Sequence, residues 1–446
     1  MLPKLTISSN NQSHHAKMKK LLLVLTALLF SFYAFSDGGD TIRVMQYNLL
    51  YYDMNTGFCN SSNNNVDLKD QYLQTILGHY KPDIFTVNEM GGSLQSVDRL
   101  MNNALNVNGI NYYKRANYTG SYIVNMLYYN SNLLQYHSQS FILTTIGGNN
   151  IRITDVYKLY YKSSTLEKGD TTFLTCMVGH LKAGNGTEEV AIRQEAAQQI
   201  MAFIKNRNIQ GNILLMGDFN LYRASEPAFQ TFMTPTTTGV RFYDPVNALG
   251  DWQDNPFFAQ YHTQSTHTES NCYSGGGMDD RFDFILATQQ ILQGTEGIKY
   301  VPNSYWAFGQ DGNRLNSSLI NPVNNSLPAN VIDALYYNSD HLPVVLKLFF
   351  EDNNPGSSLL NTQNKKWLRF SNTGGGELQY WSNSSSDEVF NLTIHNLIGS
   401  KVYEKNVTIL PGEKQKIDIS SLSTGIYLVR AYKEGSAPIV TRIAKQ

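Results

Sequence analysis

The decisive stretch of the chain is Leu214–Asn220, which reads Leu-Leu-Met-Gly-Asp-Phe-Asn. It continues an apolar run that begins at Ile213 and stops at Gly217. In a strand, residues i and i+2 point to the same side, so Asp218 and Asn220 are presented together where the strand ends. A carboxylate and an amide side by side suit a hard cation, a water molecule or a phosphate oxygen. The same residues also fit an ordinary strand-to-turn exit, so the interpretation depends on partners elsewhere in the chain.

On both sides of this stretch, strand-like and helix-like segments alternate, which predicts a layered α/β or α+β domain. Helices are predicted over Leu68–Tyr80, Leu94–Leu105 and Glu188–Asn206. Two long polar segments, Gly250–Gly277 and Asn303–Asn330, predict surface loops around a cleft. Runs rich in β-branched and aromatic residues predict strands over Ile42–Asn48, Ile84–Asn88, Ile123–Tyr129, Ile151–Tyr161, Thr172–Gly179, Ile213–Met216, Phe282–Ala287 and Val344–Phe350.

The first residues predict export. Met18-Lys19-Lys20 precedes the apolar stretch Leu21–Phe35, and Ala34-Phe35-Ser36 fits a small-x-small cleavage site. Residues 1–36 are therefore predicted to be a leader and signal peptide, and the apolar run is too short to favour a membrane span. Without them, 31 basic residues face 36 acidic ones, a net charge of −5. This balance argues against tight, purely electrostatic binding of nucleic acid, but not against an enzyme that contacts it transiently.

Three cysteines remain in the exported part. Cys59 and Cys272 lie in polar loops and are predicted to form a disulfide, whereas Cys176 lies in an apolar run and is predicted to be a buried thiol. No C-x-x-C pair supports a zinc or iron–sulfur site. The Asn-, Pro-, Gly- and Ser-containing segment after residue 351 predicts a linker over 352–365, between a first domain over 37–351 and a small all-β sandwich over 366–446.

Further polar motifs follow other predicted strands. Each alone fits a solvated loop residue, a turn or a cap. Together, in a chain that is only 16% charged, they indicate a shared cleft, because strand ends at one edge of packed sheets converge. The motifs are Asn48, Glu89, His180, Asp283 and Ser339–His341.

This ordered set, with Gly217–Asn220 between His180 and Asp283, resembles the endonuclease/exonuclease/phosphatase superfamily. That superfamily includes deoxyribonuclease I, abasic-site endonucleases, bacterial sphingomyelinases and inositol polyphosphate 5-phosphatases. The resemblance covers about residues 40–350. It implies a four-layer α/β/β/α sandwich with its site at one edge of two packed sheets, and metal-dependent hydrolysis of a phosphodiester.

The resemblance also implies a division of roles. Glu89 is the first choice for direct coordination of Mg²⁺, with Asn48 and Asp340 as neighbours directly or through water, because a hard cation prefers oxygen ligands. Mn²⁺ is a substitute and Ca²⁺ an alternative. His341, paired with Asp283, is predicted to be the general base or the group that orients water.

The remaining roles concern the phosphate. Asp218 and Asn220 are predicted to position the water or a phosphate oxygen, and His180 to donate to a non-bridging oxygen or assist the leaving group. The deoxyribonuclease I pattern gives this first histidine a glutamate partner from the strand equivalent to Ile123–Tyr129, but no acid lies there, so Asn125 is the predicted substitute. The other predicted substrate contacts are Lys182, which is alternatively a solvated lysine, and Tyr118 or Tyr122.

The end of the chain resembles a different family. Asn391–Tyr403, Ile417–Arg430 and the basic ending Arg442–Gln446 resemble the C-terminal sorting domain of the type IX secretion system of Gram-negative bacteria. The Asn-Pro usual near the start of such domains is missing, and the alternative is a carbohydrate-binding or adhesive β-sandwich. The resemblance implies a protein that passes the type IX machinery and is secreted or held at the cell surface.

The leading hypothesis is a secreted, monomeric, Mg²⁺-dependent phosphodiesterase, an extracellular nuclease acting on DNA and as an alternative on RNA. A sphingomyelinase-like phospholipid phosphodiesterase is the second hypothesis; it requires an exposed apolar hairpin, for which Trp252, Phe257 and Phe258 are the candidates. A phosphomonoesterase for inositol phosphates is less favoured, because the chain is acidic. A non-catalytic surface protein that retains the fold is opposed by the intact set of polar motifs.

Overall fold

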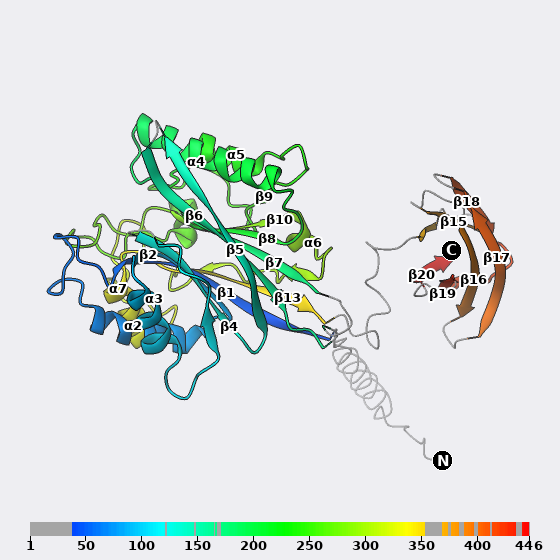
Figure 1. The fold of residues 1–446 in the computed structure, drawn as a ribbon, viewed down its shortest axis with the longest axis horizontal. Coiled ribbons are helices and arrows are strands. Elements are labelled where there is room, and N and C mark those ends of the chain that lie inside the picture. The colour runs from blue at the N-terminus through cyan, green and yellow to red at the C-terminus, as the bar shows by residue number, and fades with distance from the viewer. Residues whose placement is uncertain are drawn as a thin grey trace, which may run out of the picture. The chain divides into compact units, whose positions relative to one another are not determined.

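The computed structural model describes residues 38–120, 123–146, 149–164, 166, 171–352, 368–372, 376–382, 388–396, 400–410, 413–433 and 439–445 (Figure 1). The predicted leader over 1–36, residues 353–365 of the predicted linker and Tyr122 lie outside the described residues.

Two mainly antiparallel sheets form the centre of the first part of the chain. The first has the order β11-β13-β1-β2-β4-β3, and β12 pairs with β13. Its strands are β1 (Gly39–Tyr52), β2 (Ile84–Gly91), β3 (Tyr113–Arg115), β4 (Ile123–Asn130), β11 (Ile298–Tyr300), β12 (Trp306–Ala307) and β13 (Val344–Glu351). The second has the order β5-β6-β7-β8-β10-β9, with β5 (Leu134–Ile146), β6 (Asn149–Tyr161), β7 (Phe173–His180), β8 (Ile213–Asp218), β9 (Phe242–Tyr243) and β10 (Asp283–Thr288).

Helices cover the outer faces of both sheets (Figure 1). On the first sheet lie α2 (Val66–Tyr80), α3 (Leu94–Leu100), the π-helical turn η1 (Met101–Leu105) and α7 (Ala329–Asn338). On the second lie α4 (Thr187–Asn206) and α5 (Pro227–Met233). The short helices η3 (Pro256–Tyr261) and α6 (Gln289–Gln293) lie in connections. The chain therefore has the predicted four-layer α/β/β/α fold.

Side-chain alternation along β8 shows how the layers are joined. Leu214 and Met216 belong to the core that links the two sheets, whereas Ile213 and Leu215 pack with the helices α4 and α5. This period of two is the strand pattern in which successive side chains point to opposite faces. Because β8 is buried on both faces, its sequence is a continuous apolar run, as a central strand requires.

All eight predicted strands are present, but several elements were missed: β3, β5, β9, β11, β12, α5, α6 and α7. The prediction of surface loops over Gly250–Gly277 and Asn303–Asn330 is partly wrong, because many of their side chains are buried. Their polar groups are satisfied inside the protein: His262 Nε2 lies 2.8 Å from the carbonyl oxygen of Trp252, and Arg314 forms an ion pair with Asp311. Internal partners make burial of polar residues tolerable.

The C-terminal part is a separate pair of sheets with a core of its own. One sheet contains β14 (Leu368–Asn372), β15 (Glu377–Ser382) and β18 (Lys414–Asp418). The other contains β16 (Glu388–Asn396), β17 (Lys401–Ile409), β19 (Gly425–Tyr432) and β20 (Ile439–Lys445). Leu378, Phe390 and Val429 are buried between them, which confirms the predicted all-β class. Across the described ranges, no helix is long and apolar enough to cross a membrane.

Candidate active site

The predicted polar residues gather where strands of both sheets begin or end. Because β8 pairs parallel with β7 and antiparallel with β10, Asp218 lies opposite both His180 and Asp283. Gly217 allows this close approach of β7 and β8, since a Cβ there would lie 1.7 Å from the carbonyl oxygen of Gly179. The glycine of the opening motif is thus required by packing.

The first sheet brings its residues to the same place through irregular backbone. The ladder between β2 and β4 shifts between Val87 and Met90, and Glu89 within that shift has a φ of 54°. Asn220, beyond the end of β8, has a φ of 50°. Such bulges and left-handed residues are uncommon outside glycine and cluster at functional sites, where they redirect a side chain.

Asp218 connects the two sheets. Its Oδ1 accepts from the backbone nitrogen and Nδ2 of Asn220, at 3.1 and 2.9 Å, and its Oδ2 accepts from Nδ2 of Asn48 at 3.0 Å. Its backbone nitrogen donates to Oδ1 of Asn88 at 3.1 Å. Burial raises the pKa of Asp218 to about 7, although the charge of His341 acts in the opposite direction. Asp218 is therefore a buried acid held in one orientation.

His341 forms the predicted pair with Asp283. Its Nδ1 lies 2.7 Å from Oδ2 of Asp283, and its Nε2 lies 3.7 Å from Oδ2 of Asp218. Burial disfavours the charged ring, but the carboxylates of Asp283 and Asp218 outweigh burial and hold the pKa of His341 well above its ordinary value. The side-chain amide of Gln264 lies 2.7 Å from Nε2 of His341 and 3.1 Å from Oδ2 of Asp340, a bridge that the sequence did not predict.

Glu89 and Asp340 fit a hard cation. Oδ2 of Asp340 accepts from the backbone nitrogen of Ser274 at 2.9 Å, while its buried Oδ1 has no hydrogen-bond partner among the described residues. Burial raises the pKa of Glu89, and the charge of Asp340 raises it further, so two carboxylates share a water-poor space. A cation removes that conflict and supplies the missing partner of Asp340.

Other predicted ligands are less simply arranged. Oδ1 of Asn48 accepts from the backbone nitrogen of Leu50 at 3.0 Å, and its amide group faces Asp218. A second group of potential ligand atoms, from Glu89, His180 and Asp218, lies within 4.8 Å of one another. The donor set is thus mainly carboxylate oxygen with one imidazole, which suits Mg²⁺ or Mn²⁺.

His180 does not have Asn125 as its partner. Oδ1 of Asn125 accepts from Asn88 at 2.7 Å, and its Nδ2 lies 3.2 Å from Oδ2 of Asp155 in β6. Nδ1 of His180 lies instead 3.3 Å from Nη1 of Arg152, while its Nε2 lies 3.4 Å from Oδ2 of Asp218. Burial and the charge of Arg152 lower the pKa of His180 well below its ordinary value.

Two predicted phosphate contacts have other partners. Nζ of Lys182 donates to the carbonyl oxygen of Ala183 at 3.0 Å, and the hydroxyl of Tyr118 donates to the carbonyl oxygen of Gly92. The positive charge beside His180 comes from Arg152, near the start of β6. The sequence gave only a weak signal for it: a charged residue within a strand-like run.

A buried lysine also supports the site. Nζ of Lys69, in α2, donates to the carbonyl oxygen of Leu50 at 3.3 Å, to Oδ1 of Asn64 at 3.0 Å and to the carbonyl oxygen of Asn338. Burial lowers its pKa to about 7. Lys69 thereby ties the end of β1 to the end of α7, from which the chain leads directly to Asp340.

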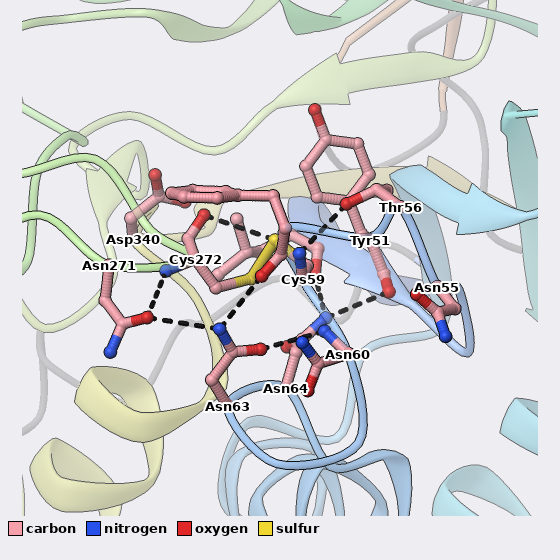
Figure 2. Close-up of a disulfide and its surroundings, with 12 residues drawn as sticks. Tyr51, Asn55, Thr56, Cys59, Asn60, Asn63, Asn64, Asn271, Cys272 and Asp340 are labelled. Atoms are coloured by element: carbon pink, nitrogen blue, oxygen red, sulfur yellow. Dashed lines mark hydrogen bonds between the residues drawn. A yellow bond between two sulfur atoms is a disulfide. The ribbon is translucent and has the colours of Figure 1, made fainter.

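The predicted disulfide is present, and Figure 2 shows Asp340 among its surroundings. Cys59 and Cys272 join two loops that are 213 residues apart in sequence. Two residues after Cys272, the backbone of Ser274 holds Oδ2 of Asp340. The disulfide therefore braces the loop that supports this carboxylate. Cys176 is free and buried, as predicted.

The four layers and the strand-end cluster of acids and histidines define a deoxyribonuclease I-like fold with a candidate hydrolytic site. A model described as the endonuclease/exonuclease/phosphatase family matches residues 45–306, and a model described as a secretion system C-terminal sorting domain matches residues 378–446. The first match spans more than half of the chain, which therefore belongs to the endonuclease/exonuclease/phosphatase family. Members of this family hydrolyse phosphoester bonds. No curated protein matches the chain.

Several solved structures are similar to the chain. The human Nocturnin catalytic domain with bound sulfate is 14% identical, with 70% of this chain and 94% of that chain covered and a TM-score of 0.44. An endonuclease/exonuclease/phosphatase protein from Bacteroides vulgatus has the same identity and TM-score, with 70% and 100% covered. D. rerio TDP2 with a single-strand DNA product is 14% identical, with 69% and 99% covered and a TM-score of 0.44. No substrate follows from similarity of this size.

Proposed function

We propose that the protein is an exported, divalent-cation-dependent phosphodiesterase, a nuclease that acts on DNA and also on RNA. The observation that carries the proposal is the buried His341–Asp283 pair, 2.7 Å apart, whose free ring edge faces Asp218. A histidine that is oriented by a carboxylate and directed into a cluster of acids is suited to bind and activate a water molecule.

The other residues have supporting roles in this proposal. Asp218 and Asn220 hold the water or a phosphate oxygen, since their mutual hydrogen bond fixes both groups. Glu89 and Asp340 would hold the cation, with Asn48 beside them; Mg²⁺ is the first candidate, and Mn²⁺ and Ca²⁺ are alternatives. When bound, such a cation neutralises charge on the phosphate and on the departing oxygen. The chain's own contribution is a site in which every reacting group is buried and oriented before substrate arrives.

The phospholipid alternative has less support. Of the three aromatic residues predicted to reach a lipid, Trp252 is fully buried, and its Nε1 donates to the carbonyl oxygen of Ala248 at 2.7 Å. Phe258 packs against the core of the second sheet, so only Phe257, 87% exposed, projects into solvent. One exposed ring is a small anchor for a membrane surface.

The matched sorting domain indicates export to the cell surface or beyond. We further propose the route and the domain limits. Residues 1–36 are a signal peptide for the first membrane of a Gram-negative cell, 37–351 the catalytic domain, 352–365 a linker, and 366–446 the domain that the type IX machinery recognises. The catalytic domain acts as a monomer in this proposal.

The test is the cleavage of plasmid DNA, RNA and sphingomyelin by the full chain, each with Mg²⁺ and with EDTA. We expect degradation of nucleic acid that requires the cation and no release of phosphocholine. Cleavage of sphingomyelin with intact DNA would overturn the proposal.

A matched pair of variants links the activity to the site. Glu89→Gln removes a predicted ligand charge at almost constant volume and is expected to reduce activity to background. Glu188→Gln makes the same change on the exposed first turn of α4 and is expected to retain full activity. Equal activity of the two variants would show that Glu89 is not in the machinery.

A further inference from the structure

We infer that Arg152 binds the phosphate group of the substrate and fixes His180 as the neutral tautomer protonated on Nε2. This inference rests on the proposed function for the kind of phosphate ester, but the contacts that carry it are independent of the substrate. Arg152 lies in β6, and its Nη1 is 3.3 Å from Nδ1 of His180. None of the sequence motifs contains this arginine.

The chemistry of the two groups determines the tautomer. A guanidinium has five N–H donors and no acceptor, and it keeps its charge inside proteins. Nδ1 of His180 must therefore accept, which leaves the ring proton on Nε2. That nitrogen lies 3.4 Å from Oδ2 of Asp218 and 3.7 Å from Oε1 of Glu89. His180 thus presents an N–H donor to the centre of the site and brings no charge of its own.

The charge balance then assigns the phosphate to Arg152. The centre of the site holds several carboxylates, so an anionic substrate needs a cation from the protein as well as any bound metal ion. Lys69 is buried with its ammonium group enclosed by oxygen atoms, and Nζ of Lys182 donates to a neighbouring carbonyl. Arg152 is only partly buried and its charge acts on Glu89, at the centre of the site.

The shape of the guanidinium matches this task. One N–H is used by His180, and the others remain for the two non-bridging oxygens of a phosphate, a planar two-point contact that lysine cannot make. We therefore expect Arg152→Lys to lose much of the effect although it keeps the charge. Arg152→Gln loses the charge and the two-point contact together.

The first test measures the affinity of the full chain for inorganic phosphate by calorimetry. Arg152→Gln is expected to weaken binding about 10- to 100-fold, and Arg152→Lys by a smaller factor. Lys158→Gln is the matched control, because Lys158 lies in the same strand but its Nζ sits 4.1 Å above the ring of Phe173, away from the site. Unchanged phosphate affinity in both Arg152 variants would overturn the phosphate role.

The second test reads the tautomer by ¹⁵N NMR of histidine-labelled protein, with His180→Gln used to assign the signals. In the native chain, Nδ1 of His180 is expected to lack a proton and Nε2 to carry one. Arg152→Gln is expected to redistribute the proton between the nitrogens, whereas Lys158→Gln leaves it unchanged. A protonated Nδ1 in the native chain would overturn the inference.

The two proposals fail separately. If the native chain cleaves no phosphodiester but phosphate affinity and the tautomer depend on Arg152, the proposed function fails and the inference stands. If the chain is a nuclease and Arg152→Gln has native KM, kcat and phosphate affinity, the inference fails alone. When both hold, Arg152→Gln is expected to raise KM more than it lowers kcat.

Discussion

His341 and His180 lie in one site and are both buried, yet their environments drive them to opposite charge states. His341 contacts Asp283, and the surrounding carboxylates raise its pKa well above the ordinary value. His180 contacts Arg152, and its pKa is lowered well below the ordinary value. Burial alone would make both rings neutral. The charged partner therefore decides the state of each ring, and two similar histidines acquire different chemical capacities.

This difference assigns unequal roles to the two halves of the site. The half around His341 can handle protons, because a carboxylate fixes and charges the ring. The half around His180 can only donate a hydrogen bond and hold the phosphate. The four predictions below test this division, starting with the largest expected effect.

Replacement of each histidine by glutamine should separate the halves most strongly. We expect His341→Gln to lower kcat/KM about 10³-fold, because general base assistance is lost. His180→Gln should lower it only about 10-fold, because glutamine can still donate a hydrogen bond. Nuclease kinetics on plasmid DNA provide the measurement. The exposed His137→Gln is the control, and equal losses at His341 and His180 would contradict the division.

Asp283→Asn should reduce kcat/KM about 10²-fold, because the ring of His341 loses the carboxylate that orients it. The double variant Asp283→Asn/His341→Gln should be no slower than His341→Gln alone, since both changes remove one function. The exposed Asp333→Asn serves as control. Multiplying losses in the double variant would show that Asp283 acts independently of His341.

The disulfide should matter for the His341 half only. Cys59→Ser/Cys272→Ser is expected to lower the free energy of unfolding by about 2–5 kcal/mol, since the denatured chain is no longer cross-linked. It should also weaken cation binding, because the loop of Ser274 supports Asp340. Urea unfolding and Mg²⁺ titration are the measurements.

The NMR signals of His180 should be unchanged in this variant, and a reducing agent should have no further effect on it. Stability equal to that of the native chain would show that the disulfide has no bracing role.

The smallest effect concerns Asp155, which supports Asn125 near the His180 half. Burial raises the pKa of Asp155 to about 7, so the folded state binds this proton more tightly than the unfolded state does. Stability from this group is therefore lost as the pH rises from about 4 to about 7. Asp155→Asn should raise the free energy of unfolding at pH 8 by roughly 1–3 kcal/mol and change it little at pH 4.

Thermal unfolding at the two pH values measures this difference, with Asp333→Asn as the exposed control. An equal effect of Asp155→Asn at pH 4 and pH 8 would mean that packing, and not the buried charge, is responsible.

Local sequence pattern was sufficient for the strands that carry the site. Polar residues after apolar runs identify strand ends, and glycine before Asp218 is required by the close approach of β7 and β8. The pattern failed at β5, because Phe141 and Leu143 are exposed and the strand alternates without a clear apolar face. It also failed at the two-residue strands β9 and β12, which exist only through their partners.

The sequence by itself determined the fold class, the sorting domain, the cysteine pairing and which polar residues end the strands, because each is a local pattern or a recognisable order of motifs. The tertiary structure alone decided the partners. Arg152 meets His180 across 28 residues of sequence, and Gln264 bridges His341 and Asp340 across more than 70. Such contacts depend on strand register and loop packing between distant segments, and they set the charge of each histidine. No spacing along the chain contains that information.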